Sequence, residues 1–434
     1  MAQLFFILLV AGATAWFVQS IRKIIRNISF GIPFDRTDNA SERWKTMIRV
    51  ALGQSKMVSR PIPAILHLFV YVGFVLINIE VLEMFVDGTS GGHRSFSFLG
   101  GFYSFLIGFF EVLAFLVTLG CFLFFIRRNV LHIQRLRSGD LNGWPRSDAN
   151  IILISEMVLM TALFIMNASD SILQTRPEIM HHYKSVGMFP ISSFIAPLLS
   201  NLSSLNLVIL ERSCWWFHII GILAFLNYLP YSKHFHIVMA FPNTYYSKLA
   251  AVGQLTSPEN IQNEVKAMLD PSFVPPAPTE GTAPLRFGAK DITDLSRKQL
   301  MDAYTCTECG RCTSSCPANQ TGKLLSPRKI MMNTRDRIEE LGHLADQNKG
   351  VLTDDGKSLF NYITPEEIWA CTTCNACVQE CPVNIDPVSI IIELRRYLVM
   401  EQSQAPSELN QMLTNIENNG APWQFSGADR LNWQ

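Results

Sequence analysis

The sequence predicts a mainly α-helical protein, in which a five-helix transmembrane bundle is followed by a smaller helical domain on the cytoplasmic side. Three observations predict this fold class. Hydrophobic residues make up 48% of the 434 residues and charged residues only 17%, with a mean hydropathy of +0.19, which is rare for a wholly soluble protein. The apolar runs are confined to residues 1–240, and the sequence that follows is polar. Two similar cysteine-rich stretches lie in that polar part.

Five apolar segments define the predicted transmembrane domain, residues 1–250. Each is close to the roughly 20 residues that a helix needs to cross a bilayer. The predicted helices cover residues 4–22, 62–85, 99–126, 149–168 and 213–236.

Basic residues determine the predicted orientation of the bundle. They gather in loops 22–60 and 127–146, whereas loops 86–98 and 169–211 are much poorer in them. Basic loops stay on the cytoplasmic side, so we expect a multi-pass protein of the bacterial inner (cytoplasmic) membrane with its N-terminus outside. The first apolar run has its positive charges after it, which predicts an uncleaved helix and not a signal peptide. Lys+Arg and Asp+Glu balance at 36 each, so nothing indicates a nucleic-acid partner.

The polar part divides into three predicted regions. Residues 251–289 form a helical and Pro-rich linker, in which 271–278 is expected to be stiff and extended. Residues 290–402 form a domain with helical patterns near 295–304, 326–342 and 387–400. Pro327 stands at the first turn of the second of these helices, where a missing N–H is tolerated. Residues 403–434 form a polar tail.

The two cysteine stretches share the spacing C-x2-C-x2-C-x3-C-P, which holds 4Fe-4S clusters in bacterial two-cluster ferredoxins. Three thiolates separated by two residues wrap one cubane, and the fourth cysteine reaches the other cluster. We therefore expect one cluster on Cys306, Cys309, Cys312 and Cys381, and the other on Cys371, Cys374, Cys377 and Cys316. Structural zinc is an alternative, but it has no use for the third cysteine and the repeated Cys-Pro. Disulfides would need an oxidising compartment, which the predicted topology argues against.

Three histidines lie in the predicted membrane helices or at their ends: His67, His218 and His236. Positions 218 and 236 differ by 18 residues, so a continuous fifth helix would project both from one face, about 27 Å apart. His67 and His236 have the same predicted depth near the cytoplasmic side. Two neutral imidazoles that face each other across a bundle can hold a haem b. The alternative is a hydrogen-bonded or interfacial histidine, which fits His236 beside His234.

His218 has no evident partner for a second haem. The partner would stand about ten residues after His67, where the sequence has Ile77. Either no outer haem forms, or His181 or His182 supplies the ligand, or His218 hydrogen-bonds a quinone.

Glu80, Glu111 and Glu156 fall inside apolar helices, where a bare carboxylate is unfavourable. Each is expected to face the bundle interior, to be protonated, or to be paired. There it either passes protons during quinone chemistry or makes a structural hydrogen bond between helices.

The chain resembles a combination of known families. Residues 1–250 resemble the cytochrome b (gamma) subunit of respiratory nitrate reductase and the anchors of membrane-bound heterodisulfide reductases. The resemblance rests on the five helices, His67, the spacing of His218 and His236, and the stretch Leu-Pro-Tyr-Ser-Lys-His-Phe-His at 229–236. Residues 290–402 resemble the α-helical ferredoxin domain of heterodisulfide reductase, glycolate oxidase and succinate dehydrogenase iron–sulfur subunits. The fusion is similar to the N-terminal half of the membrane iron–sulfur proteins that pass electrons from electron-transfer flavoprotein to menaquinone.

Two departures from these families matter. Their second helix usually carries two histidines ten residues apart, and the second is Ile77 here. Full-length relatives carry Cys-rich catalytic domains after the ferredoxin domain, whereas no cysteine follows Cys381. We therefore expect that chemistry on a separate chain.

The resemblance implies an electron-transfer subunit of a quinone-linked oxidoreductase. Electrons would pass between a cytoplasmic redox partner, two 4Fe-4S clusters, haem b and the menaquinone pool. The partner would be a Cys-rich iron–sulfur subunit, electron-transfer flavoprotein, or both, and one haem is expected, or two if His218 has a partner. We find no catalytic nucleophile constellation. The alternative is a haem-free membrane anchor that carries a ferredoxin-like relay, and a transporter is disfavoured because no inverted repeat is present.

Overall fold

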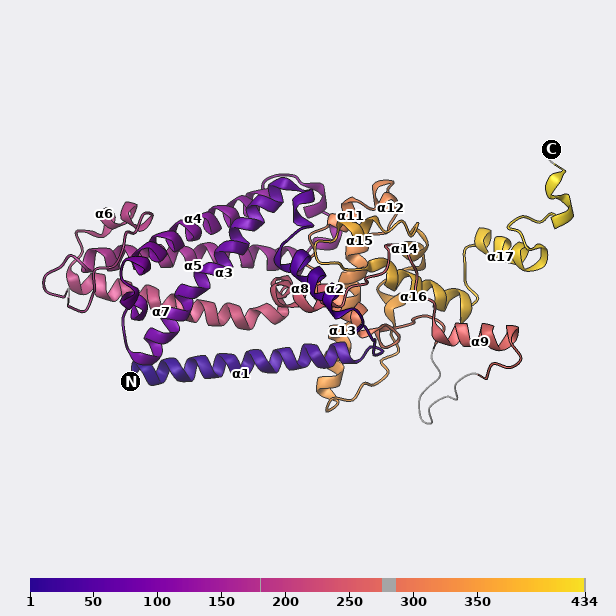
Figure 1. The fold of residues 1–434 in the computed structure, drawn as a ribbon, viewed down its shortest axis with the longest axis horizontal. Coiled ribbons are helices and arrows are strands. Elements are labelled where there is room, and N and C mark those ends of the chain that lie inside the picture. The colour runs from indigo at the N-terminus through magenta and orange to yellow at the C-terminus, as the bar shows by residue number, and fades with distance from the viewer. Residues whose placement is uncertain (180, 275–285, 433–434) are drawn as a thin grey trace. The chain divides into compact units, whose positions relative to one another are not determined.

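The computed structural model describes residues 1–179, 181–274 and 286–432, and it is mainly helical, as predicted (Figure 1). Within these ranges no β-strand occurs, and a parallel bridge joins Ile32 to Ser296. Residues 275–285, which include part of the predicted Pro-rich linker, lie outside the described residues.

The chain divides into two compact units. The first comprises residues 1–25, 49–239 and 307–309, and the second comprises residues 26–48, 240–306 and 310–434. The second unit therefore includes residues 26–48, which lie between the first two predicted membrane helices. Three residues of the first cysteine stretch are grouped with the membrane helices, which no linear division of the sequence would predict.

The described residues contain five helices that are long and apolar enough to cross a membrane. They are α1 (Ala2–Ser29), α3 (Pro61–Ser90), α4 (Gly101–Asn129), α5 (Trp144–Leu173) and α7 (Ser204–Tyr228). Their number agrees with the prediction, and each is longer than expected or displaced, because the helices continue into flanking turns that mix polar and apolar residues.

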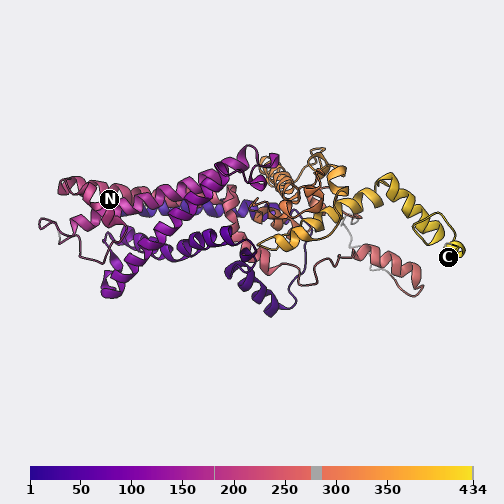
Figure 2. The ribbon, with the colours of Figure 1, turned by 90° about the horizontal axis from the view of Figure 1, so that it is seen from above.

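Small residues let the helices of the first unit pack closely. α5 packs against both α4 and α7, and α3 packs against α4 (Figure 1, Figure 2). A Cβ added at Gly73 of α3 would collide with Val117 of α4, and one added at Gly221 of α7 would collide with Leu159 of α5 at 2.5 Å. Close approach through small residues is typical of membrane helix pairs.

The fifth helix differs from the prediction. α7 ends at Tyr228, and two 3-10 helices, η7 (Leu229–Tyr231) and η8 (Lys233–Phe235), precede α8 (His236–Tyr245). The expectation that one helix over 213–236 carries His218 and His236 on one face is therefore wrong. Pro230 has no N–H to continue the α-helical ladder. Ser232 then adopts an extended conformation, and its side chain accepts from the backbone N–H of His234.

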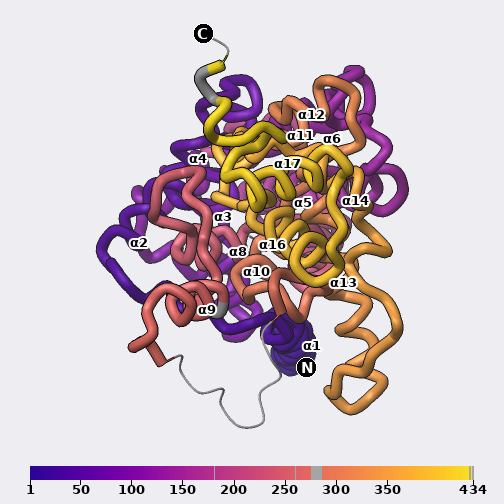
Figure 3. Tube along the Cα trace, turned by 90° about the vertical axis from the view of Figure 1, so that its right-hand side faces the viewer, coloured from indigo at the N-terminus to yellow at the C-terminus, as the bar shows by residue number. Residues whose placement is uncertain are grey.

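Three helices that pack together form the centre of the second unit: α10 (Arg297–Thr305), α13 (Pro327–Gln347) and α16 (Pro387–Met400). α13 packs against both α10 and α16, and Figure 3 shows the three helices together. Ser326 caps α13 by accepting from the N–H of Lys329, and Pro327 begins it, as predicted.

Other helices complete this unit. They are α2 (Ala40–Met47), α9 (Glu259–Leu269), α11 (Arg311–Ser314), α12 (Pro317–Gln320), α14 (Pro365–Trp369), α15 (Ala376–Glu380) and α17 (Ser407–Asn419). In the first unit, α6 (Ala196–Leu199) is a single turn. α11 and α15 lie inside the two cysteine stretches and pack against each other, so the second unit brings the two stretches together.

Candidate functional site

The two cysteine stretches have the same backbone. Two and four residues after its first cysteine, each has residues in the left-handed region: Glu308 (φ 55°) and Gly310 (φ 70°), then Thr373 (φ 55°) and Asn375 (φ 60°). Such turns point successive N–H groups into one concavity, which favours an anion. In the second stretch the N–H of Thr373 donates to the Sγ of Cys371 at 3.4 Å. The loops are therefore shaped to stabilise thiolates and cluster sulfides.

The cysteines are free thiols, so the disulfide alternative is not realised in this structure. Cys316 of the first stretch interacts electrostatically with Cys371 and Cys377 of the second. Burial raises the pKa of both of these thiols, and the neighbouring cysteines raise it further. This proximity agrees with the predicted ligand set of Cys371, Cys374, Cys377 and Cys316.

Among the residues described, no three His, Cys, Asp or Glu side chains converge as the ligands of a single metal ion do. A cubane cluster does not need its ligands to converge on one point, because each of its four cysteines binds a separate iron at a separate corner. The N–H groups of Thr373 and Ile385 donate to the Sγ atoms of Cys371 and Cys381, and donors of this kind fit a cluster bound by thiolates. The ligand sets of both clusters stay predictions.

The two stretches differ in exposure. Cys306, Cys316, Cys377 and Cys381 are buried, whereas Cys374 is exposed. Next to Cys371, Arg395 of α16 donates to the carbonyls of Ile368 (2.8 Å) and Cys371 (2.5 Å). The second stretch therefore has both a solvent-facing cysteine and a fixed positive charge.

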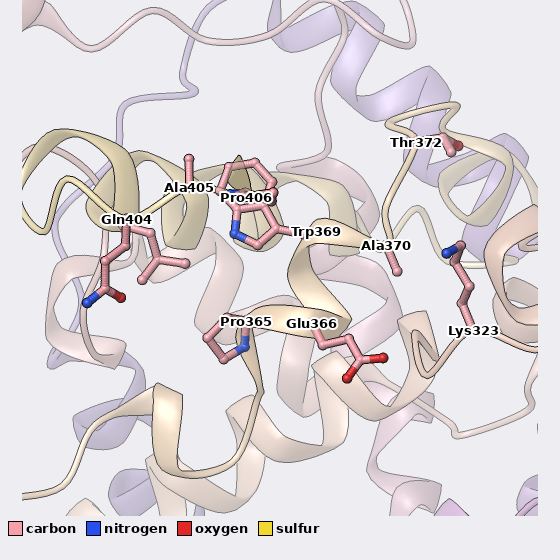
Figure 4. Close-up of a pocket in the computed structure, with 10 residues that line it drawn as sticks. Lys323, Pro365, Glu366, Trp369, Ala370, Thr372, Gln404, Ala405 and Pro406 are labelled. Carbon is pink, nitrogen blue, oxygen red and sulfur yellow. The ribbon is translucent and has the colours of Figure 1, made fainter. Parts of the chain in front are cut away.

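An open pocket of about 630 Å³ lies beside the second stretch. Trp369, Pro406 and Ala405 line one part of it, and Lys323 and Thr372 lie at another (Figure 4). Thr372 directly follows Cys371, so the pocket adjoins the predicted second cluster.

His67, His234 and His236 come together at the end of the bundle that holds η7 and η8. His234 interacts electrostatically with both of the others, and its ring centroid lies 5.5 Å from that of His236. Burial, reinforced by these two histidines, lowers the pKa of His234 to about 3, and burial also lowers the pKa of His236. The imidazoles of His234 and His236 are therefore neutral at pH 7. The structure brings His67 near this segment, as predicted, and adds His234, which we had considered only as a neighbour of His236.

The tautomer of His236 suits a metal. Its Nδ1 lies 3.0 Å from the carbonyl oxygen of Lys233, so Nδ1–H donates and the Nε2 lone pair is left available. Metal-ligating histidines usually donate their other ring N–H in this way. These residues fit a haem b, and its ligation by His67 and His236 stays a prediction.

His218 is buried, and its Nδ1 lies 3.1 Å from the carbonyl oxygen of Leu159. Ile77, Leu159 and Ile219 belong to the surrounding apolar cluster. His181 and His182 are exposed and pack on each other, with ring centroids 4.1 Å apart. The described contacts thus give His218 a backbone partner and do not bring it to a second histidine.

Two of the predicted membrane carboxylates have protein partners. Glu80 pairs with Arg94 (3.3 Å), and Arg94 also pairs with Asp170 (2.9 Å). Glu111 accepts from the side chains of Asn167 (3.1 Å) and Ser192. Both carboxylates thus make the structural interactions that we had considered as one alternative. Glu156 differs from them, because it is only half-buried.

Asp148 at the start of α5 holds the turn that follows α7. It accepts from Tyr228 Oη (2.5 Å), Ser232 Oγ (2.6 Å) and the backbone N–H of Lys233 (3.0 Å). The Lys233 side chain continues to the carbonyl oxygen of Pro145 (2.5 Å) and forms an ion pair with Glu308. These contacts fix the segment that carries His234 and His236.

Comparisons with known proteins agree with the cysteine pattern. Residues 305–385 match a 4Fe-4S dicluster domain. The whole region that holds both cysteine stretches is thus of one known type.

The relatives are iron–sulfur proteins. The chain is 29% identical to the probable iron-sulfur-binding oxidoreductase FadF of Bacillus subtilis, over 99% of the chain and 60% of the relative. It is 26% identical to the EtfAB:quinone oxidoreductase of Syntrophomonas wolfei, over 92% of the chain and 54% of the relative. A probable membrane-anchored ferredoxin of Chromohalobacter salexigens is 31% identical over 36% of the chain and 25% of the relative. The chain therefore spans little more than half the length of the first two relatives. No solved structure matches it.

Proposed function

We propose that this chain is a membrane-bound electron-transfer subunit of a quinone-linked oxidoreductase. Electrons pass between a redox partner on the cytoplasmic side and the menaquinone pool, through two 4Fe-4S clusters and one haem b. The observation that carries the proposal is that one chain holds both a dicluster domain and three neighbouring histidines, His67, His234 and His236, in or next to five apolar helices.

The clusters and the haem supply one-electron redox chemistry when bound. The chain's own residues hold and insulate these centres. The left-handed turn at Thr373 directs its N–H toward the sulfur of Cys371, and the Lys233 carbonyl oxygen sets the tautomer of His236. The similarity to the EtfAB:quinone oxidoreductase of Syntrophomonas wolfei supports a quinone as the membrane substrate and an electron-transfer flavoprotein as the partner.

The test is the haem content of the protein purified anaerobically in detergent. We expect a reduced α-band after dithionite and one haem b per chain by pyridine haemochrome. His67→Ala and His236→Ala should abolish this haem, and His218→Ala should retain it. His234→Ala serves as the neighbouring control, because it removes an imidazole from the same segment. Cluster absorption without haem would contradict the proposal and favour the haem-free anchor.

A further inference from the structure

The loop of the first cysteine stretch makes a charged contact with the segment that carries the histidines. Glu308 lies between Cys306 and Cys309, and its carboxylate forms an ion pair with the ammonium of Lys233, the residue before His234. The side chains are 2% and 9% exposed, respectively, so the pair is almost fully desolvated. Residues 307–309 belong to the same compact unit as Lys233.

A second contact holds the same loop. Nη1 of Arg135, in the segment between α4 and α5, donates to the carbonyl oxygen of Cys309 at 2.9 Å. The predicted ligand Cys309 is thus held through its own backbone, and the residue before it is held through its side chain. Both contacts come from the unit that contains His67, His234 and His236.

The second cysteine stretch shows that the carboxylate of Glu308 is not needed to form the loop. Thr373 occupies the equivalent position with the same left-handed φ of 55° and has no charge. Cys374, which follows Thr373, is exposed, whereas its counterpart Cys309 is half-buried and Glu308 itself is buried. The carboxylate at this position therefore serves a contact that only the first stretch makes, its ion pair with Lys233.

A buried ion pair contributes little net stability, because desolvating the charges offsets their attraction. It does fix geometry, and the rate of electron transfer falls steeply with the distance between centres. A contact that fixes a cluster loop against a histidine segment acts on that distance.

We infer that the cluster held by the first stretch is the one that exchanges electrons with the haem, and that Lys233 and Glu308 are the positioning residues for this step. The inference rests on the proposed function and adds the order of the centres to it. The second cluster, with Cys374 exposed, then exchanges electrons with the soluble partner. When both groups are bound, this step would carry one electron at a time and would neither form nor break a covalent bond.

The experiment uses the full holoprotein in detergent and follows the haem α-band by stopped flow after mixing with a low-potential reductant. Lys233→Met and Glu308→Gln should each slow haem reduction about tenfold to a hundredfold, since small displacements of reacting centres have effects of this size. Lys233→Arg, which keeps the charge, should stay close to the wild-type rate. The double variant with Lys233→Glu and Glu308→Lys should recover part of the loss.

Cluster electron paramagnetic resonance spectra, cluster potentials and haem content should be unchanged in these variants. Lys357→Met is the matched control, because it breaks the exposed Lys357–Glu340 ion pair and should leave the rate unchanged. Wild-type rates in Lys233→Met and Glu308→Gln would overturn the inference, as would a loss in one of them without the other. Absence of haem from the wild-type protein would instead refute the proposed function, and pyridine haemochrome detects this before any rate is measured.

Discussion

In the first unit, the side chain of Arg94 joins three buried polar residues. Its guanidinium pairs with Glu80 and Asp170 and donates to Asn167 at 2.7 Å, and the residue is 6% exposed. Arg94→Met would leave two buried carboxylates without a counter-charge, and we expect a loss of about 3–5 kcal/mol of stability. Thermal unfolding in detergent measures this. Lys45→Met is the control, because both side chains of its ion pair with Glu42 are exposed. An unchanged Tm for Arg94→Met would contradict the role given to this network.

Arg395 offers a second test at the scale of one residue. Its charge lies beside Cys371 and is held by the Ile368 and Cys371 carbonyls. A nearby positive charge favours the more reduced, more negative state of a cluster, so Arg395→Gln should lower the midpoint potential of the second cluster. Redox titration followed by electron paramagnetic resonance measures the shift. The first cluster is the internal control, and equal shifts in both clusters would contradict the assignment.

Single residues differ in how far the sequence predicts them. The cysteine ligands follow from spacing alone, because a cubane demands thiolates at fixed intervals. His234 and Glu308 do not follow, because their significance depends on tertiary contacts with His67 and Lys233. The sequence offers one indication that Glu308 matters: only the first stretch has a charged residue between its first two cysteines.

At the scale of elements, the apolar helices were predictable because length and hydropathy determine them. The break after Tyr228 was not, because the run stays apolar through Pro230 and its end depends on contacts with Asp148. A substitution of Asp148 therefore tests whether the break after Tyr228 helps to hold the haem. Asp148→Ala removes three hydrogen bonds, each worth about 1 kcal/mol, and should loosen the turn before His236.

We expect Asp148→Ala to lower haem retention without unfolding α5, as measured by pyridine haemochrome and circular dichroism. Asp148→Asn should have a smaller effect, because its remaining oxygen can still accept from Tyr228 and Ser232. Full haem content in Asp148→Ala would show that the turn holds its shape without this side chain.

At the scale of the whole molecule, the two compact units should respond differently to the loss of iron. Cys306, Cys316, Cys377 and Cys381 are buried in or beside the second unit, and the packing of α11 on α15 joins the two cysteine stretches. Metal binding to such sites is coupled to folding, because the unfolded chain has no preformed site. The long helices of the first unit are instead supported by their own apolar packing.

Chelation of iron under mild oxidation should therefore increase hydrogen exchange across residues 297–400, while α3, α4 and α5 stay protected. The ion pair of Glu308 with Lys233 adds a sharper expectation. Because residues 307–309 group with the first unit, they should lose protection less than residues 371–381, which belong to the second unit. Hydrogen exchange resolved by peptide distinguishes the two segments. Equal loss of protection in both would mean that the cluster, and not the ion pair, holds the first loop in place.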